Sequence, residues 1–238
     1  MAGRCKGWSR SSHPSPAKVC PAVPPSRDAP ETGGAMRNIL GILMIGLLLT
    51  TSLGKVSADP LEDGIASYQR GDFAAALRLF RPLAEQGDAS AQSNLGVMYE
   101  QGRGVAQNYR EAMRLFRLAA MQGDASAQSN LGVMYYTGQG IAQDFREAMR
   151  WYRLGAGQGN AEAQFNLGVM YEQGRGVPQD LLRAHMWFNL AVSQSSEENG
   201  KLAIKNRDIV TRRLTREQLF QAQEMARQCE ANGFKNCD

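Results

Sequence analysis

The sequence has 238 residues, of which 43% are hydrophobic and 21% are charged, as in an ordinary globular protein with a buried core. Its 27 Lys and Arg exceed its 23 Asp and Glu, but residues 1–58 hold seven of the basic residues and two of the acidic ones. Removing these from the totals leaves 20 basic and 21 acidic residues in 59–238. A nucleic-acid partner is therefore excluded, because binding to phosphates needs clustered positive charge.

Residues 1–35 are rich in Ser and Pro and match no structural pattern. We interpret Met36 as the true start of translation, which makes the upstream stretch a start-site artefact. The alternative is a long, disordered N-terminal extension.

Residues 36–58 have the three regions of a secretory signal peptide. A short basic start (36–38) precedes an apolar run of fifteen residues (39–53), and 56–58 form a small-residue cleavage site. The run is shorter than the about 20 residues that span a membrane. We therefore expect cleavage after Ala58 and a periplasmic or secreted protein with no stable membrane span.

Residues 59–87 predict a helix pair, with helices over 61–70 and 73–86. The turn between them is only Gly71-Asp72, which is shorter than the turns further along the chain. We interpret this segment as an N-terminal capping half-unit.

Residues 88–195 form three units with a period of 36 residues. The string DASAQSNLGVMY occurs at 88–99 and again at 124–135, and NLGVMY returns at 166–171. Each unit predicts two helices, which we call helix A (89–101 in the first unit) and helix B (108–122). Such a period indicates stacked helix pairs rather than a single globular core.

The repeated pattern A-x-x-x-L-G-x-x-Y-x-x-G-x-G-V-x-x-D/N resembles the Sel-one-like repeat (SLR), which is related to the tetratricopeptide repeat. In the first unit it is carried by Ala91, Leu95, Gly96, Tyr99, Gly102, Gly104, Val105 and Asn108. The resemblance implies an all-α fold, an α-solenoid of antiparallel helix pairs in a right-handed superhelix. It also implies a non-enzymatic adaptor or scaffold that needs no cofactor and binds a protein or peptide on the concave face lined by helix A.

Resemblance to tetratricopeptide geometry assigns nine residues to that concave face: Ser93, Val97, Glu100, Ser129, Val133, Tyr136, Phe165, Val169 and Glu172. Tyr136 and Phe165 are large, whereas Glu100 and Ser129 occupy the same positions one unit earlier. We expect the two aromatic side chains to be exposed anchors for the partner. Neutral drift would produce the same changes, and Phe165 could instead pack as core.

Residues 59–238 contain one histidine, His185, and two cysteines, Cys229 and Cys237. A zinc site needs three or four such ligands, and a Ser-His-Asp or Cys-His centre needs a histidine beside its nucleophile. We therefore expect no metal and no catalytic centre, and we interpret His185 as a packed helix residue. Two alternatives stay open. One is an envelope hydrolase that uses carboxylates such as Glu100 and Glu172, and the other is an assembly factor held in the membrane by its N-terminal segment.

Six arginines also follow the period and predict two ladders along helix B: Arg78, Arg114 and Arg150, and Arg81, Arg117 and Arg153. Glu111 and Glu147 lie three residues before Arg114 and Arg150, so local ion pairs are available. We interpret the ladders as a solvated outer face, with a surface for an acidic partner as the alternative.

Residues 196–238 do not repeat, and they predict C-terminal capping helices. Ser196-Glu197 can start one helix, and Thr215-Arg216-Glu217-Gln218 is a capping box that starts another. Cys229 and Cys237 are eight positions apart, and the helix-stop signal Asn232-Gly233 between them lets the chain turn back. In an exported protein this pair predicts a disulfide.

Overall fold

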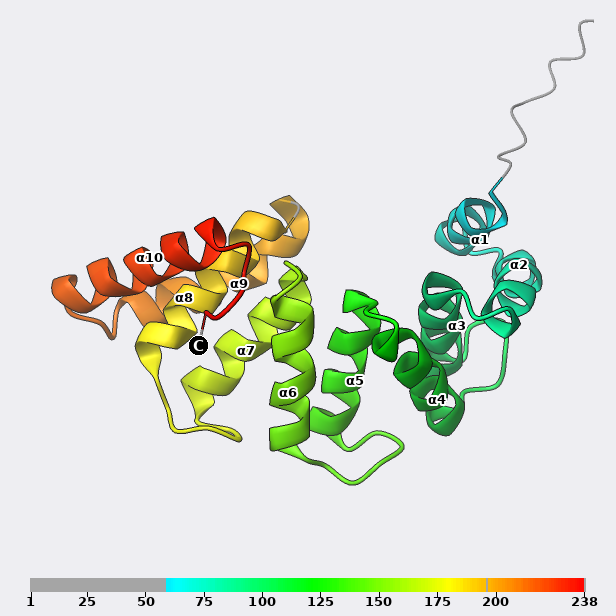
Figure 1. Cartoon of the computed structure of the whole chain (residues 1–238), viewed down its shortest axis with the longest axis horizontal. Coiled ribbons are helices and arrows are strands. Elements are labelled where there is room, and N and C mark those ends of the chain that lie inside the picture. The colour runs from blue at the N-terminus through cyan, green and yellow to red at the C-terminus, as the bar shows by residue number, and fades with distance from the viewer. Residues whose placement is uncertain (1–58, 196, 238) are drawn as a thin grey trace, which may run out of the picture. The chain divides into compact units, whose positions relative to one another are not determined.

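The computed structural model describes residues 59–195 and 197–237, and this part of the chain contains ten α-helices and no strand. The predicted signal peptide and residues 1–35 lie outside this part. Each of the helices α1 to α8 packs against the next one along the chain, and α9 and α10 both pack against α8 (Figure 1). The helices are α1 (Pro60–Gln69), α2 (Phe73–Glu85), α3 (Ala89–Gln101), α4 (Tyr109–Met121), α5 (Ala125–Thr137), α6 (Phe145–Ala156), α7 (Ala161–Gln173), α8 (Leu181–Gln194), α9 (Glu197–Thr211) and α10 (Arg216–Ala231).

Capping residues at fixed places in the repeat set the helix boundaries. In the three units, the residue just before helix A is Asp88, Asp124 or Asn160. Its side chain accepts a hydrogen bond of 2.7–2.8 Å from the backbone N–H of the residue three positions later. The same helices end at glycines with φ between 68° and 76°, namely Gly102, Gly138 and Gly174. The predicted bounds of helix A in the first unit, 89–101, are confirmed by α3.

Within each helix pair, a glycine of the first helix lies against an aromatic ring of the second. The four pairs are Gly64 with Phe80, Gly96 with Phe116, Gly132 with Tyr152, and Gly168 with Phe188. A Cβ atom at Gly96 would lie 2.7 Å from the Phe116 ring, so a larger residue could enter only if the pair moved apart. All four rings are buried, so each helix pair contributes its own part of the hydrophobic core. The predicted solenoid of helix pairs is therefore confirmed.

Buried glutamines at one fixed position of the repeat join neighbouring helix pairs. Gln92, Gln128 and Gln164 each donate from Nε2 to a backbone carbonyl of the preceding pair at 3.1–3.3 Å. Gln122 and Gln158 then donate to Oε1 of Gln92 and Gln128. These bonds satisfy polar groups that would otherwise be costly to bury.

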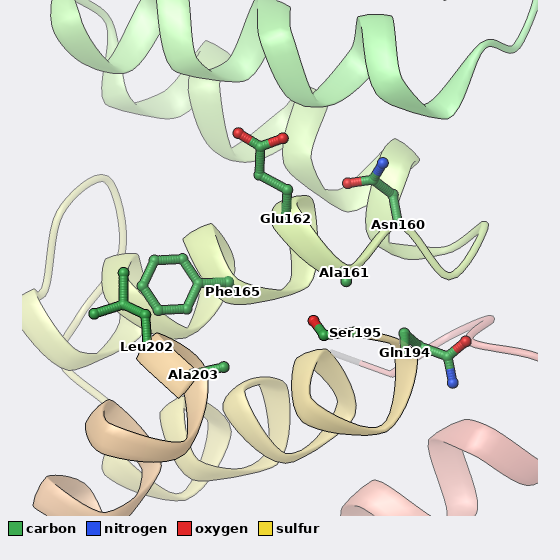
Figure 2. Close-up of a pocket in the computed structure, with 8 residues that line it drawn as sticks. All are labelled: Asn160, Ala161, Glu162, Phe165, Gln194, Ser195, Leu202 and Ala203. Atoms are coloured by element: carbon green, nitrogen blue, oxygen red, sulfur yellow. The ribbon is translucent and has the colours of Figure 1, made fainter. Parts of the chain in front are cut away.

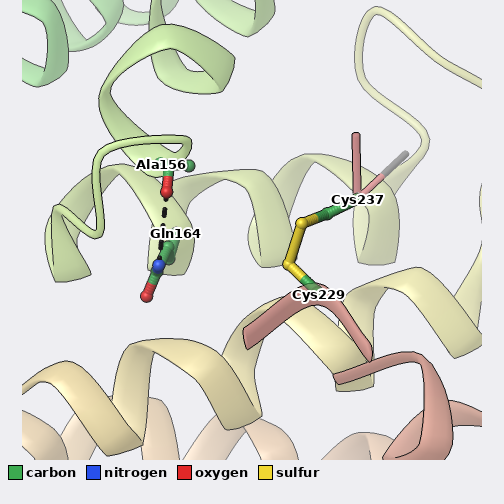
Figure 3. The surroundings of a disulfide bond; sticks show 4 residues. All are labelled: Ala156, Gln164, Cys229 and Cys237. Carbon is green, nitrogen blue, oxygen red and sulfur yellow. Dashed lines mark hydrogen bonds between the residues drawn. A yellow bond between two sulfur atoms is a disulfide. The ribbon is translucent and has the colours of Figure 1, made fainter. Parts of the chain in front are cut away.

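The glutamine series stops at the third unit. Figure 3 shows Gln164 bonded to the carbonyl of Ala156, as its counterparts are to theirs. Its Oε1 atom, however, is buried without a partner, since Gln194, the residue that corresponds to Gln158, donates to the Ser193 hydroxyl instead. The register of the repeats therefore ends at α8.

The segment after α8 covers the end of the stack. The predicted capping box at Thr215 and Gln218 is confirmed, whereas Ser196 lies outside the described residues. Cys229 and Cys237 are joined by a disulfide (Figure 3). The loop that it closes places the Phe234 ring where a Cβ on Gly159 would be only 3.2 Å away, so the loop contacts the turn between α6 and α7. No helix of the described residues is long and apolar enough to cross a membrane.

Replacing Cys229 with serine is expected to lower the free energy of unfolding by about 2–3 kcal/mol, because the disulfide closes a short loop. The last turn of α10 should fray and Phe234 should leave Gly159, while the helices of the repeats stay folded. Hydrogen exchange measures this directly: amides after residue 226 should lose protection and those of α3 to α7 should keep it. Loss of protection throughout α3 to α7 would contradict the capping role.

Candidate functional site

The residues predicted for the helix A face do not share one environment. Ser93 and Ser129 are 6% and 0% exposed, so the prediction that they line an accessible face is wrong. They are buried because helices pack closely around these small side chains: a Cβ on Gly155 of α6 would be 3.6 Å from the backbone N of Ser129. The other seven residues are half-buried: Val97, Glu100, Val133, Tyr136, Phe165, Val169 and Glu172.

Tyr136 holds two repeats together. Its hydroxyl donates to Oε1 of Gln173 at 3.1 Å and accepts from Arg175 at 2.6 Å, and both residues belong to the next unit. The Arg175 guanidinium also lies 5.3 Å from the centre of the Tyr136 ring. Tyr68 forms the same contacts with Gln101 and Arg103. The half-buried Tyr136 ring is therefore already engaged within the chain and is not a free anchor.

Replacing Tyr136 with alanine is expected to lower the free energy of unfolding by about 1–3 kcal/mol, because a half-buried ring and two hydrogen bonds between repeats are lost. Tyr136→Phe keeps the ring and should cost only about 1 kcal/mol. Urea unfolding followed by circular dichroism measures both values. If Tyr136→Ala unfolds at the same urea concentration as the wild type, Tyr136 does not join the repeats.

Phe165 lies beside a cavity of about 370 Å³ between α7, the end of α8 and α9. Figure 2 shows Phe165, Leu202 and Ala203 together on one side of this cavity, whereas the side chains of Glu162 and Asn160, which also line it, point away from these three residues. The Phe165 ring is half-buried against Phe188, with their centres 5.6 Å apart, and Leu202 is 55% exposed. We call this the α7–α9 cavity.

The α7–α9 cavity lies where the repeat register ends. Phe165 replaces the buried Ser129 of the preceding unit, and Glu162 replaces Ser126. The helix at the next helix A position, α9, begins 36 residues after α7 but does not repeat the sequence of α7. The change at Phe165 was recognised in the sequence, whereas the change at Glu162 was missed although the same comparison of units contains it.

Two carboxylates of the A helices, Glu162 and Glu100, have shifted pKa values. Desolvation raises the pKa of Glu162, and desolvation followed by repulsion from Glu162 raises the pKa of Glu100. Glu162 is nevertheless exposed, and it is one of the residues that line the cavity. Within the part of the chain that the structure describes, no Lys or Arg forms an ion pair with either carboxylate.

Other candidate residues are accounted for within the fold. Glu172 forms an ion pair of 3.4 Å with Arg213 of the C-terminal segment. His185 is 2% exposed, and burial lowers its pKa. No group of three metal-ligating side chains was found among residues 59–195 and 197–237.

Several arginines of the two ladders contact other residues of the fold. Arg114 and Arg150 pair with Glu111 and Glu147 at 2.6 Å and 3.2 Å on an exposed surface. The next ladder reaches across repeats, since Arg117 donates to the Tyr135 hydroxyl at 3.2 Å. These contacts agree with the interpretation of a solvated outer face.

Comparison with known structures agrees with the helix pairs described above. The chain is similar to a Sel1 repeat protein from Oxalobacter formigenes, with 27% identity and a TM-score of 0.55 over 74% of this chain and 75% of that one. It is also similar to c5321, a protective antigen of uropathogenic Escherichia coli strains with an SLR fold, with 28% identity and a TM-score of 0.50. That match covers 72% of this chain but only 47% of the longer antigen. Among curated proteins, none matches the chain.

The Sel1 repeat model matches the chain four times, at residues 53–88, 89–124, 125–160 and 161–196. The first match includes the segment interpreted above as an N-terminal capping half-unit, and the other three follow the 36-residue units. Together the matches cover more than half of the sequence. The chain therefore belongs to the Sel1 repeat family.

Proposed function

We propose that this chain is an exported, non-enzymatic scaffold that binds a segment of a partner protein in the α7–α9 cavity. Sel1 repeat proteins are typically scaffolds for protein–protein interaction. The proposal rests mainly on the cavity. Phe165 and the exposed Leu202 line it, whereas the earlier repeats have a buried serine, Ser93 or Ser129, at the position of Phe165. Apolar pockets of this kind with a few polar groups at the rim are typical binding sites.

Export is supported by three features. Residues 36–58 have the pattern of a signal peptide, and the C-terminal disulfide is of the kind found in oxidising compartments. Cleavage after Ala58 would also leave α1 complete, since Asp59 caps this helix by accepting a hydrogen bond of 2.9 Å from the backbone N of Leu61. We therefore place the mature protein in the periplasm or outside the cell.

The intact mass of the natively expressed protein is expected to correspond to residues 59–238 with one disulfide. A mass that includes residues 36–58 would favour the membrane-held assembly factor. A mass that includes residues 1–35 would show that translation does not start at Met36.

Affinity capture from an envelope extract tests the docking site. Leu202→Gln alters the cavity wall, and Leu118→Gln makes the same change at a residue of α4 that is 40% exposed and far from the cavity in sequence. We expect Leu202→Gln to lose the partner that the wild type and Leu118→Gln both retain. If both variants retain the same partner, the α7–α9 cavity is not its binding site.

A further inference from the structure

We infer that the surface around Gly123 binds an aromatic side chain at the tip of a loop of another protein. The surface around Gly159 holds Phe234 of the chain's own C-terminal loop in the same way. This second docking surface is formed mainly by the B helices and does not rest on the α7–α9 cavity. It follows from the match between the two surfaces, from the cover that the described residues give to only one of them, and from the backbone of the covering loop.

The two surfaces are built from the same residue types one repeat apart. Each consists of an arginine near the end of a B helix, the glycine after that helix, a tyrosine of the next A helix and a tryptophan of the next B helix. The Gly123 surface has Arg117, Gly123, Tyr135 and Trp151, and the Gly159 surface has Arg153, Gly159, Tyr171 and Trp187. In both, the arginine donates to the tyrosine hydroxyl at 3.2 Å. A group that fits one surface is therefore expected to fit the other.

The chain's own C-terminal loop, which the disulfide closes, covers the Gly159 surface (Figure 3). A Cβ on Gly159 would lie only 3.2 Å from the Phe234 ring. Phe234 and Cys237 also line one cavity together with Trp187. The Phe234 backbone has a φ of 63°, a left-handed conformation that is rare for a bulky residue and persists only where the surrounding structure imposes it. The loop therefore holds the Phe234 ring on this surface at a conformational cost.

The described residues leave the Gly123 surface open. A Cβ on Gly123 would meet open space, and Gly123 is exposed whereas Gly159 is half-buried. Tyr135 is half-buried, but its counterpart Tyr171 is only 5% exposed. The surface that holds an aromatic ring at the end of the stack is therefore uncovered one repeat earlier.

The Trp151 indole gives a second reason to expect an occupant. It is 9% exposed, and its N–H is buried without a hydrogen-bond acceptor among the described residues. Its counterpart Trp187, beside the C-terminal loop, has a partner. Because a buried N–H without an acceptor is costly, a loop that brings a carbonyl oxygen next to its aromatic residue would bind through both groups. The first repeat has Leu115 at this position and lacks this part of the surface.

A loop at Gly123 is expected to cover little else of α4. Leu154, the counterpart of Leu118, is 45% exposed although the C-terminal loop covers the Gly159 surface. Leu118 should therefore stay uncovered when the Gly123 surface is occupied.

NMR titration with a disulfide-closed peptide tests the inference on the protein expressed from the full-length gene. The probe has the sequence of residues 229–238, Cys-Glu-Ala-Asn-Gly-Phe-Lys-Asn-Cys-Asp, and its counterpart carries alanine in place of phenylalanine. We expect the phenylalanine peptide to shift the Gly123 amide and the Trp151 indole N–H. The alanine peptide should bind about tenfold more weakly, because it lacks the ring.

Two matched glycine variants separate the surface from the backbone. Gly87 and Gly123 both have a φ of 94° and open space at the Cβ position. Gly87→Leu and Gly123→Leu impose the same backbone strain, but only Gly123→Leu puts a side chain where the ring would lie. We expect Gly123→Leu to abolish the shift of the Trp151 indole N–H and Gly87→Leu to bind like the wild type, while both melting temperatures fall alike.

Equal binding of the two peptides, no shift at Gly123, or unchanged binding by Gly123→Leu would overturn the inference. A shift of the Gly87 amide as large as that of Gly123 would also contradict it, because the first repeat has Leu115 in place of the tryptophan. None of these results bears on the α7–α9 cavity, where the Ala203 amide should stay unshifted.

Discussion

Replacing Phe116 with alanine is expected to lower the free energy of unfolding by about 3–5 kcal/mol, the largest effect of any single change proposed for this chain. The Phe116 ring is 0% exposed and fills the space that Gly96 leaves open in the same helix pair. No neighbouring side chain can take its place without moving α3 against α4. The melting temperature should fall by about 10 °C, measured by circular dichroism.

Phe220→Ala is the matched control, since Phe220 of α10 is 65% exposed and its ring lies beside the exposed Arg227. Its removal should change the free energy of unfolding by less than about 1 kcal/mol. If Phe116→Ala and Phe220→Ala have the same melting temperature, the contact between the glycine and the aromatic ring does not stabilise the helix pairs.

Replacing Phe165 with serine is expected to weaken binding of the captured partner by about 30-fold, which corresponds to about 2 kcal/mol. Phe165 supplies a half-buried aromatic ring to the lining of the α7–α9 cavity, and aromatic residues commonly supply much of the energy of an interface. Serine occupies the same position one unit earlier, at Ser129, so the helix accepts it. Titration of the purified partner measures the affinity.

The cost in stability should be smaller than for Phe116, because Phe165 is only half-buried and contacts Phe188 from one side. A loss of about 1–2 kcal/mol is expected, compared with 3–5 kcal/mol for a fully buried ring. A stability loss as large as that of Phe116→Ala, with no change in affinity, would make Phe165 a core residue and remove it from the binding site.

The helices could be predicted closely from the sequence because each one is bounded by local signals. The Asp or Asn caps and the left-handed glycines act within a few residues, so Asp88 and Gly102 fix α3 without reference to the rest of the fold. The 36-residue period then requires the pairs to stack. The capping residues belong to single units and the period to their repetition, so both can be recognised in one sequence.

The candidate site was harder to predict because it depends on contacts between units. Ser93 and Ser129 looked accessible on an isolated helix but are buried by neighbouring helices. Tyr136 looked free, yet its partners Gln173 and Arg175 lie in the next unit. The α7–α9 cavity exists because the segment after α8 departs from the repeat, and the position of a non-repeating helix cannot be derived from the period.

Site-specific photo-cross-linking tests whether a partner protein docks in the α7–α9 cavity. A benzoyl-phenylalanine is placed at position 202, in the wall of the α7–α9 cavity, or at position 118, on the exposed surface of α4. Irradiation in the envelope extract should yield an adduct with a partner protein at position 202 and none at 118, and the cross-link should map to one short segment of that partner. Equal adducts at both positions, or an adduct only at 118, would contradict a docking site in the cavity.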